Sequence, residues 1–178
     1  MIQNSYNIVM VARFYPIKNH LFFLDIFDAF QREVPNSTLH LIGDGELKTA
    51  IKKKVERLGL TKKVRFWGKR SDVYELLSLF DVMVMPSVSE GLGVAALEAQ
   101  AAGLPCVLSE NIPEEVDIGA GLCQFCSLTD GVTPWLKALN NVKNIPELNK
   151  QMLLSLFLEK GYSLDATRKA YFEAYKFE

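Results

Sequence analysis

Short apolar runs of strand length alternate along the chain with longer segments whose apolar positions recur at helical spacing. The runs are NIVMVA (7–12), TLHLIG (38–43), VRFWG (64–68), DVMVMP (81–86) and PCVLS (105–109), and a further strand is expected at 122–126. They are apolar throughout rather than at every second position, which is typical of strands buried on both faces.

Segments with helical periodicity separate these runs. HLFFLDIFDAFQREV (20–34) is stopped by Pro35 and Asn36, and ELKTAIKKKVERL (46–58) is followed by Gly59 as a C-cap. Further helices are expected from Ser71 or Asp72 to Leu79, at about 94–102, near 134–143, at 147–160 and from Ser163 onwards. This alternation predicts an α/β fold, a doubly wound parallel sheet with helices on both faces.

In a doubly wound sheet, ligands bind beyond the carboxyl ends of the strands, where the strand order reverses. The loops at these ends are RFYPIKN (13–19), GDGE (43–46), GKRSD (68–72) and PSVSEGLG (86–93). We therefore expect the chemistry of the protein at these loops.

Composition excludes several classes of protein. The 178 residues, 49% of them hydrophobic, suit one folded domain. The net charge of −1 lacks the basic excess of a nucleic-acid-binding face, so no nucleic acid is expected as a partner. No apolar run reaches the length of a membrane-spanning helix, and the N-terminus lacks the order of a signal peptide. Together with an odd count of three cysteines, these features predict a cytoplasmic protein.

Cys123 and Cys126 form a C-x-x-C pattern. A single pair with neither a second pair nor a histidine partner is weak support for zinc. Alternation along a strand would place the two side chains on opposite faces, which favours structural cysteines over a metal or redox site.

The stretch PSVSEGLGVAALEAQAAGLP (86–105) has a Gly-x-Gly turn that leads into a helix. The first N–H groups of a helix bind phosphate well, yet Glu90 and Glu98 bracket this turn. No Lys or Arg occurs from Asp81 through Trp135. The countercharge for a phosphate must therefore come from another loop.

Arg13 and Lys18, in the loop after the first strand, can face this turn across the sheet and supply the positive charge. A carboxylate accepts two hydrogen bonds side by side, which suits the vicinal hydroxyls of a sugar. The ligand indicated is anionic in its middle and rich in hydroxyls at its ends, as a nucleotide diphosphate sugar is.

Several segments, in this order, resemble the family-4 retaining glycosyltransferases of the group 1 class. SEGLGVAALEAQAAGLPCVLSE (89–110) resembles their Glu-x7-Glu signature and VARFYPIKNH (11–20) resembles their Arg-x4-Lys loop. The stretch between is similar over HLIGDGELKTAIKKKVERLGLTKKVRFWGKRSDVYELL (40–77). The resemblance covers residues 7–130 and is nearest to enzymes of bacterial capsule and exopolysaccharide assembly. It implies a Rossmann-like sheet that forms the C-terminal half of a two-domain B-type glycosyltransferase.

The resemblance also implies a role for each candidate residue. Glu98 would hold the ribose hydroxyls from the first turn of its helix, and Glu90 would reach the hydroxyls of the transferred sugar. Arg13 and Lys18 would neutralise the diphosphate as it leaves. The remaining donor-binding positions are the base-edging Lys69 and Arg70, the close-approach Gly43, and the turn formed by Gly91, Leu92, Gly93 and Val94.

The implied co-substrate is a UDP-sugar, with no metal and no other cofactor. Residues 1–160 would form the nucleotide-sugar-binding domain, and the helix in 161–178 would cross to a missing N-terminal domain that holds the acceptor. The protein would reach the inner face of the membrane through that domain. The aromatic stripe Tyr171, Phe172 and Tyr175 would then be exposed and allow self-association. Alone, the chain is expected to bind donor weakly and to transfer nothing.

Other interpretations stay open at this stage. Glu90 could simply cap the following helix, Glu98 could be solvated, and Gly43 could serve only a tight turn. The chain could be a free-standing nucleotide or sugar-binding module. A nicotinamide dehydrogenase is disfavoured because its glycine-rich first loop is absent, and a metal held by Glu90 and Glu98 lacks a third ligand.

Overall fold

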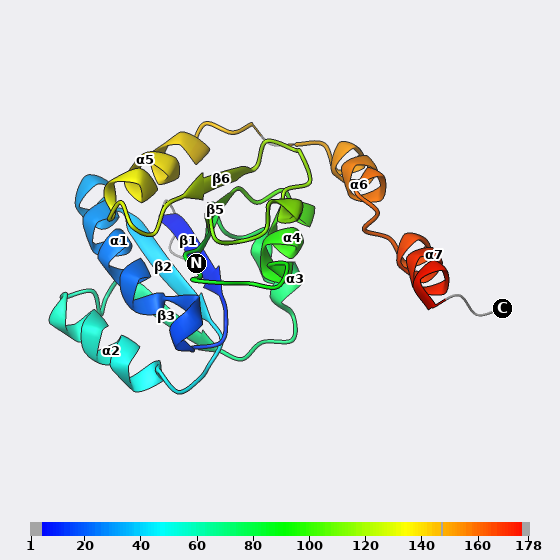
Figure 1. The fold of residues 1–178 in the computed structure, drawn as a ribbon. Helices are drawn as coiled ribbons and strands as arrows, with labels where there is room; N and C mark the ends of the chain where they lie inside the picture. The colour runs from blue at the N-terminus through cyan, green and yellow to red at the C-terminus, as the bar shows by residue number, and fades with distance from the viewer. Residues whose placement is uncertain (1–4, 147, 176–178) are drawn as a thin grey trace.

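The computed structural model describes residues 5–146 and 148–175 (Figure 1). Its strands are β1 (Tyr6–Val11), β2 (Ser37–Ile42), β3 (Val64–Gly68), β4 (Val82–Met85), β5 (Cys106–Ser109) and β6 (Cys123–Cys126). Its helices are α1 (His20–Glu33), α2 (Lys48–Arg57), α3 (Val73–Leu77), α4 (Val94–Ala101), α5 (Thr133–Val142), α6 (Lys150–Glu159) and α7 (Leu164–Tyr175), with short 3₁₀ turns η1 (Pro16–Lys18) and η2 (Glu114–Val116).

The strands form one parallel sheet in the order β3-β2-β1-β4-β5-β6. The chain first extends the sheet from β1 to β3 in one direction, and then returns to place β4 on the other side of β1. The predicted doubly wound, Rossmann-like fold is confirmed, and the strand order reverses between β1 and β4.

Both faces of the sheet are covered by helices (Figure 1). On one face Ile8 and Met10 of β1 pack among residues of α1, α2 and α5, including Phe27 and Trp135. On the other face Val9 packs among residues of α3, α4 and α6. Because successive residues of β1 enter different cores, the consecutive positions Ile8, Val9 and Met10 are all apolar, and each fully buried aliphatic side chain contributes about 1.5–3 kcal/mol.

The two cysteines of β6 lie on opposite faces of the sheet, as predicted. Cys126 belongs to the core with α5, whereas Cys123 packs against the core with α4. Both thiols are free. Within residues 5–146 and 148–175, no cluster of three or more His, Cys, Asp or Glu side chains is placed to hold a metal ion.

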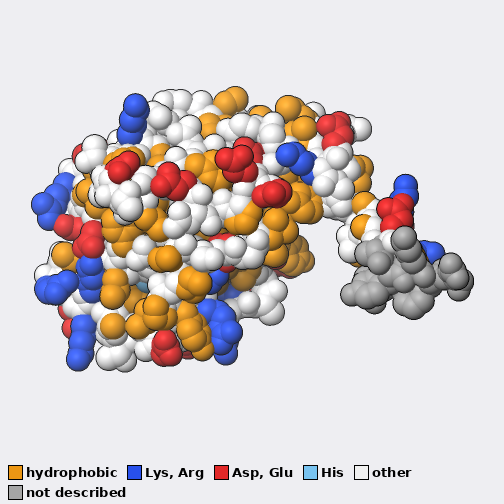
Figure 2. Space-filling view, viewed as in Figure 1, with side chains coloured by type: hydrophobic (Ala, Val, Ile, Leu, Met, Phe, Trp, Pro, Cys, Tyr) orange, Lys and Arg blue, Asp and Glu red, His pale blue; other side chains and the backbone are white. Residues whose placement is uncertain are grey.

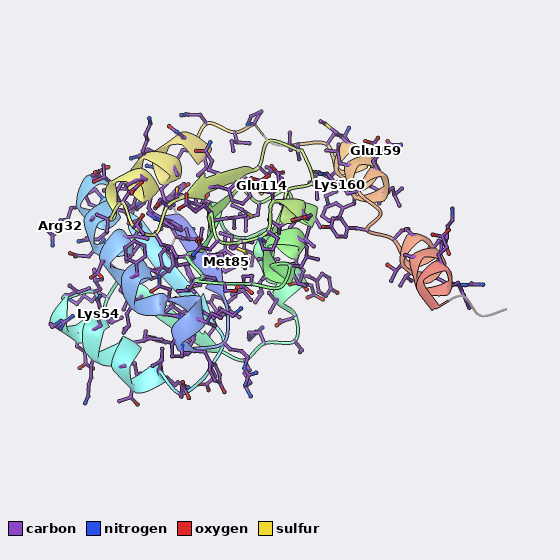
Figure 3. All side chains as sticks on the ribbon, in the orientation of Figure 1. Arg32, Lys54, Met85, Glu114, Glu159 and Lys160 are labelled. Atoms are coloured by element: carbon purple, nitrogen blue, oxygen red, sulfur yellow. The ribbon has the colours of Figure 1, made fainter. Side chains whose placement is uncertain are left out.

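The C-terminal helices lie at one end of the molecule (Figure 1). Leu153 of α6 is buried in the core that contains α4. Where α6 ends beside η2, near the labelled Lys160 and Glu114 of Figure 3, the Tyr162 hydroxyl donates to the Glu115 carbonyl at 2.7 Å. Phe172 of α7 is 53% exposed, as expected, while the side chains of Tyr171 and Tyr175 lie outside the described part of the structure.

A partly buried polar network links β1, β2 and β3 to Asp81, the residue before β4. Trp67 Nε1 donates to His40 Nδ1 at 3.0 Å, which leaves the proton on His40 Nε2 to bond Asn7 Oδ1 at 3.1 Å. The backbone N–H of Asn7 donates to Asp81 Oδ2 at 2.6 Å. Burial, and then the charge of Arg65, lower the pKa of His40 to about 4.

The second histidine is also buried and neutral. His20, the first residue of α1, packs edge-on against Phe14 at 4.8 Å between ring centroids. Neither of its ring nitrogens has a hydrogen-bond partner among the described residues. Burial, and then the charge of Lys18, lower the pKa of His20 to about 4.

We expect the free energy of unfolding to decrease as the pH falls from about 6.5 to about 4. Both imidazoles have folded pKa values of about 4, whereas an exposed histidine titrates near 6.5, so in this window the unfolded chain binds protons that the folded chain excludes. The stabilisation from each neutral, buried imidazole is fully present above about pH 6.5 and amounts to roughly 3 kcal/mol per histidine at most. Urea unfolding followed by circular dichroism across this range measures it.

The substitution His20→Leu provides the control. It removes one of the two rings, so about half of the pH dependence should disappear while the stability near neutral pH is largely kept. A free energy of unfolding that is the same at about pH 7 and at about pH 4.5 would contradict the assignment of both rings as neutral.

Candidate functional site

The loops after β1 and β4 face each other across the point where the strand order reverses. The Val88 backbone N–H donates to the Ile17 carbonyl at 2.8 Å. Lys18 Nζ lies 2.6 Å from both carboxylate oxygens of Glu90. The expected approach of these two loops is therefore confirmed, although a direct ion pair between their charged residues was not foreseen.

Two neighbouring cavities lie at this edge, and both include Val11 at the end of β1. The first, of about 440 Å³, is lined by Val11, Ala12, Arg13, Ile42, Gly43, Asp44, Lys69, Arg70 and Val73. The second, of about 310 Å³, is lined by Val11, Lys18, Met85, Glu90 and residues 91–95. Four predicted site residues thus line the first cavity and six line the second, whereas Glu98 lines neither.

Gly43 holds together the loops around the first cavity. A Cβ atom at this position would lie 1.9 Å from the Ala12 carbonyl oxygen, and the φ angle is +140°. The Gly43 N–H also donates to the Gly68 carbonyl at 2.8 Å. The ends of β1, β2 and β3 therefore meet at one residue, and close packing of backbone, beyond the turn itself, requires glycine there.

The two arginine side chains of the first cavity are anchored by their neighbours. Arg13 stacks on the Tyr15 ring at 4.6 Å and donates to its hydroxyl at 3.0 Å. Arg70 binds Asp72 through two nitrogens, and its hydrogen bond holds the pKa of Asp72 below the usual value. These contacts fix where the guanidinium groups lie at the rim.

The second cavity contains a partly buried cluster of Lys18, Glu90 and Ser87. The side chains of Lys18 and Glu90 are 24% and 10% exposed. Ser87, which is fully buried, donates from Oγ to Glu90 Oε1 at 2.7 Å. Ser87 is not predicted from the sequence, because nothing in PSVSE (86–90) distinguishes it from Ser89 before the loop is folded.

The structure overturns the simpler interpretation that Glu90 caps α4. The N-cap residue is Gly93, with a φ angle of +82°, and no side chain accepts a hydrogen bond there. Glu90 accepts from Lys18 and Ser87 instead.

The start of α4 presents backbone donors to the second cavity. Within the described residues, the N–H groups of positions 91–95 find no acceptor, whereas those of Ala96 and Leu97 bond the Gly93 carbonyl. A Cβ atom on Gly93 would crowd Ile112 at 3.2 Å, whereas one on Gly91 would meet open space. Free amides at a helix start, with Lys18 beside them, form a suitable site for an anion.

Glu98 lies farther along α4 than expected. The helix begins at Val94, so Glu98 is in the second turn, and the first turn contains no acidic residue. The prediction of a first-turn position was wrong: the helix begins where expected, at Val94, and Glu98 is its fifth residue, beyond the first turn. The Glu98 side chain is exposed on the helix surface.

Charged side chains of both signs are spread over the face seen in Figure 2.

No described helix is both long enough and apolar enough to cross a membrane.

Comparison with known proteins gives consistent results. A family model described as glycosyl transferases group 1 matches residues 5–145. EpsF of Bacillus subtilis (strain 168) is 36% identical over 152 residues, which are 85% of this chain and 40% of EpsF. The UDP-Gal:alpha-D-GlcNAc-diphosphoundecaprenol alpha-1,3-galactosyltransferase of Escherichia coli is 37% identical over 110 residues, 60% of this chain and 28% of that protein.

Solved structures share the fold at lower identity. WaaG, a glycosyltransferase involved in lipopolysaccharide biosynthesis, superposes with a TM-score of 0.76 at 18% identity, over 96% of this chain and 47% of WaaG. Anabaena HepE in complex with UDP gives 0.76 at 19% identity, over 97% of this chain and 48% of HepE. The chain thus spans less than half the length of these relatives.

We expect Gly43→Ala to lower the free energy of unfolding by at least about 3 kcal/mol, because the added Cβ overlaps a backbone carbonyl and the φ angle disfavours alanine. Gly91→Ala is the matched control: its Cβ meets nothing within 4 Å, so stability should change by less than about 1 kcal/mol. Urea unfolding of both variants tests this. Equal losses would show that the Gly43–Ala12 contact relaxes at little cost.

Proposed function

The chain belongs to the group 1 glycosyltransferases, and from this membership we propose that it holds the sugar donor, a nucleoside diphosphate sugar, at the carboxyl edge of its sheet. In the complete protein, the donor sugar is transferred with retention of configuration during polysaccharide biosynthesis. The observation that carries the proposal is the combination of Lys18, Glu90 and the free amides of α4 in the second cavity, beside the first cavity of about 440 Å³.

The two cavities suit the two ends of such a donor. The first, with Gly43 at its floor and Lys69 and Arg70 at its edge, takes the nucleoside. The second, with the amides of residues 91–95, takes the distal phosphate and the sugar. The diphosphate then lies near Val11, where the two cavities meet.

The chemistry required of this half is stabilisation of the leaving diphosphate. As the bond to the sugar breaks, negative charge grows on the phosphate oxygens, and fixed positive groups lower the energy of that state. Lys18 and Arg13 supply charge, and the start of α4 supplies oriented N–H donors. Because these groups supply the countercharge, the proposed mechanism includes no metal ion.

Glu90 and Glu98 bind different hydroxyl groups of the donor. Glu90, inside the second cavity, binds the transferred sugar. Glu98, on the exposed surface of α4, binds the ribose from the second turn of the helix. Uridine as the base is supported by the UDP in the HepE structure and by UDP-Gal in the name of the E. coli relative.

A second domain completes the enzyme in this proposal. The chain spans less than half of its relatives, and large apolar side chains of α6 and α7 are exposed, among them Leu154, Leu158, Leu164 and Phe172. We propose that an N-terminal domain, which carries the acceptor site, covers this surface. Without that domain, the chain binds donor weakly and transfers nothing.

We expect the chain to bind UDP and UDP-glucose in preference to NAD, and Glu98→Ala to weaken both uridine ligands by about 10-fold or more. A lost hydrogen bond to a charged group costs about 1.5–3 kcal/mol, and the ribose is common to the two ligands. Isothermal titration calorimetry measures the affinities. Glu159→Ala, which removes an exposed carboxylate from α6, is the control. Tight NAD binding with no response to UDP would refute the proposed function.

We also expect the chain to self-associate in solution, because the apolar side chains of α6 and α7 lack their domain partner. The double substitution Leu158→Glu and Phe172→Glu should shift sedimentation toward the monomer without loss of stability, since both side chains are more than half exposed. Leu79→Glu, at an exposed site outside these helices, is the control. A chain that is monomeric at every concentration contradicts this expectation.

A further inference from the structure

We propose that Lys18, Glu90 and Ser87 exchange partners when the donor binds, and that Ser87 is a positioning residue for Glu90. Without donor, Glu90 neutralises Lys18; with donor, the diphosphate takes Lys18 and the Ser87 hydroxyl keeps Glu90 directed at the sugar. The inference rests on the proposed function and assigns regulation to the same site.

The geometry shows that Glu90 already has two different donors. Lys18 reaches it from the loop after β1 at 2.6 Å, and Ser87 reaches it at 2.7 Å from within the same loop as Glu90. Ser87 is fully buried two residues after Met85, which Figure 3 labels in the middle of the molecule. Ser87 is therefore fixed by the core and cannot follow Lys18 to a ligand.

Lys18 has two competing partners in this arrangement. A phosphate at the free amides of residues 91–95 enters the cavity that both Lys18 and Glu90 line. The Glu90 carboxylate repels that phosphate, and its hold on Lys18 must be broken before the lysine can serve the ligand. A nucleoside diphosphate without a sugar must therefore break the Lys18–Glu90 ion pair in order to bind.

Loss of Lys18 leaves a charge that needs other donors. The Glu90 side chain is only 10% exposed, so a carboxylate stripped of its cation there is costly unless hydrogen bonds replace it. Ser87 supplies one such bond and the hydroxyls of the donor sugar supply the others. The intact donor satisfies the site, whereas the product diphosphate does not.

The consequence is a means of product release. Once the sugar has left, Glu90 keeps only the Ser87 bond and recaptures Lys18, which weakens the hold on the diphosphate. Ser87 makes no contact with the donor in this scheme; it acts through Glu90.

Titration of UDP into four proteins tests the exchange: the unaltered chain, Glu90→Gln, Ser87→Ala and the double variant. Glu90→Gln frees Lys18 and should tighten UDP binding by about three- to tenfold, while the preference for UDP-glucose over UDP falls. Ser87→Ala should weaken UDP binding by about threefold, because Glu90 then loses its last donor when Lys18 leaves. In the Glu90→Gln background, the same Ser87→Ala change should have no effect on UDP binding.

The double variant separates positioning from structure. A purely structural role for Ser87 would weaken UDP binding equally in both backgrounds, and thermal unfolding of each variant shows whether the fold is kept. UDP binding that is unchanged or weaker in Glu90→Gln overturns the exchange. A Ser87→Ala effect that persists undiminished in Glu90→Gln overturns the role of Ser87.

Inorganic pyrophosphate, which carries the diphosphate without the nucleoside, is the second probe. Glu90→Gln should tighten pyrophosphate binding as it tightens UDP binding. If the unaltered chain binds pyrophosphate but neither UDP nor UDP-glucose, the proposed function fails while the exchange is still measured. Pyrophosphate binding that is absent in all four proteins, or not tightened by Glu90→Gln, overturns the inference.

Discussion

The pairing of β1 with both β2 and β4 is the constraint on which the rest of the structure depends. β1 has a parallel neighbour on each side, and its residues face two cores because helices cover both faces of the sheet. The chain extends the sheet from β1 through β2 to β3 and then crosses back to place β4 on the other side of β1. The loops after β1 and β4 are left facing each other, tied by the bond between Val88 and Ile17. The two cavities meet at Val11 for the same reason.

The charged groups of the site come from two loops, the loop after β1 and the loop after β4. The segment that provides the start of α4 contains no Lys or Arg from position 81 to 135. The positive charge beside its free amides comes from Lys18, which lies 72 residues earlier than Glu90. The loop after β1 supplies the positive charge, and the loop after β4 supplies the backbone donors. The ion pair between Lys18 and Glu90, at 2.6 Å, shows that the two loops lie in direct contact.

The sequence predicted the fold well because β1, β2, β4 and β5 are largely buried, and their mostly apolar runs are visible without any knowledge of distant contacts. It also placed ten candidate residues at the cavities, since motif and loop coincide along the chain. It could not show that Lys18 pairs with Glu90, because that contact depends on how two loops are oriented in space. It predicted the start of α4 at Val94 correctly but assigned Glu98 to the first turn, although the fifth residue of a helix lies in the second turn. The bond from Ser87 to Glu90 was not predicted, since the sequence does not show which serine of the loop is buried beside the carboxylate.

In the turn before α4 (residues 91–93), Gly93 is packed against the core, whereas Gly91 borders open space. Gly93 packs against Ile112 and Val116, so the backbone there is committed to the core. Two residues earlier, Gly91 borders open space, and Leu92 between them is only partly buried. In evolutionary terms, the stretch at 91–92 can change in shape and size at little cost to folding, while the amides beside it stay where the helix puts them. Under the proposed function, preference for one sugar over another can change at these positions without altering the start of α4.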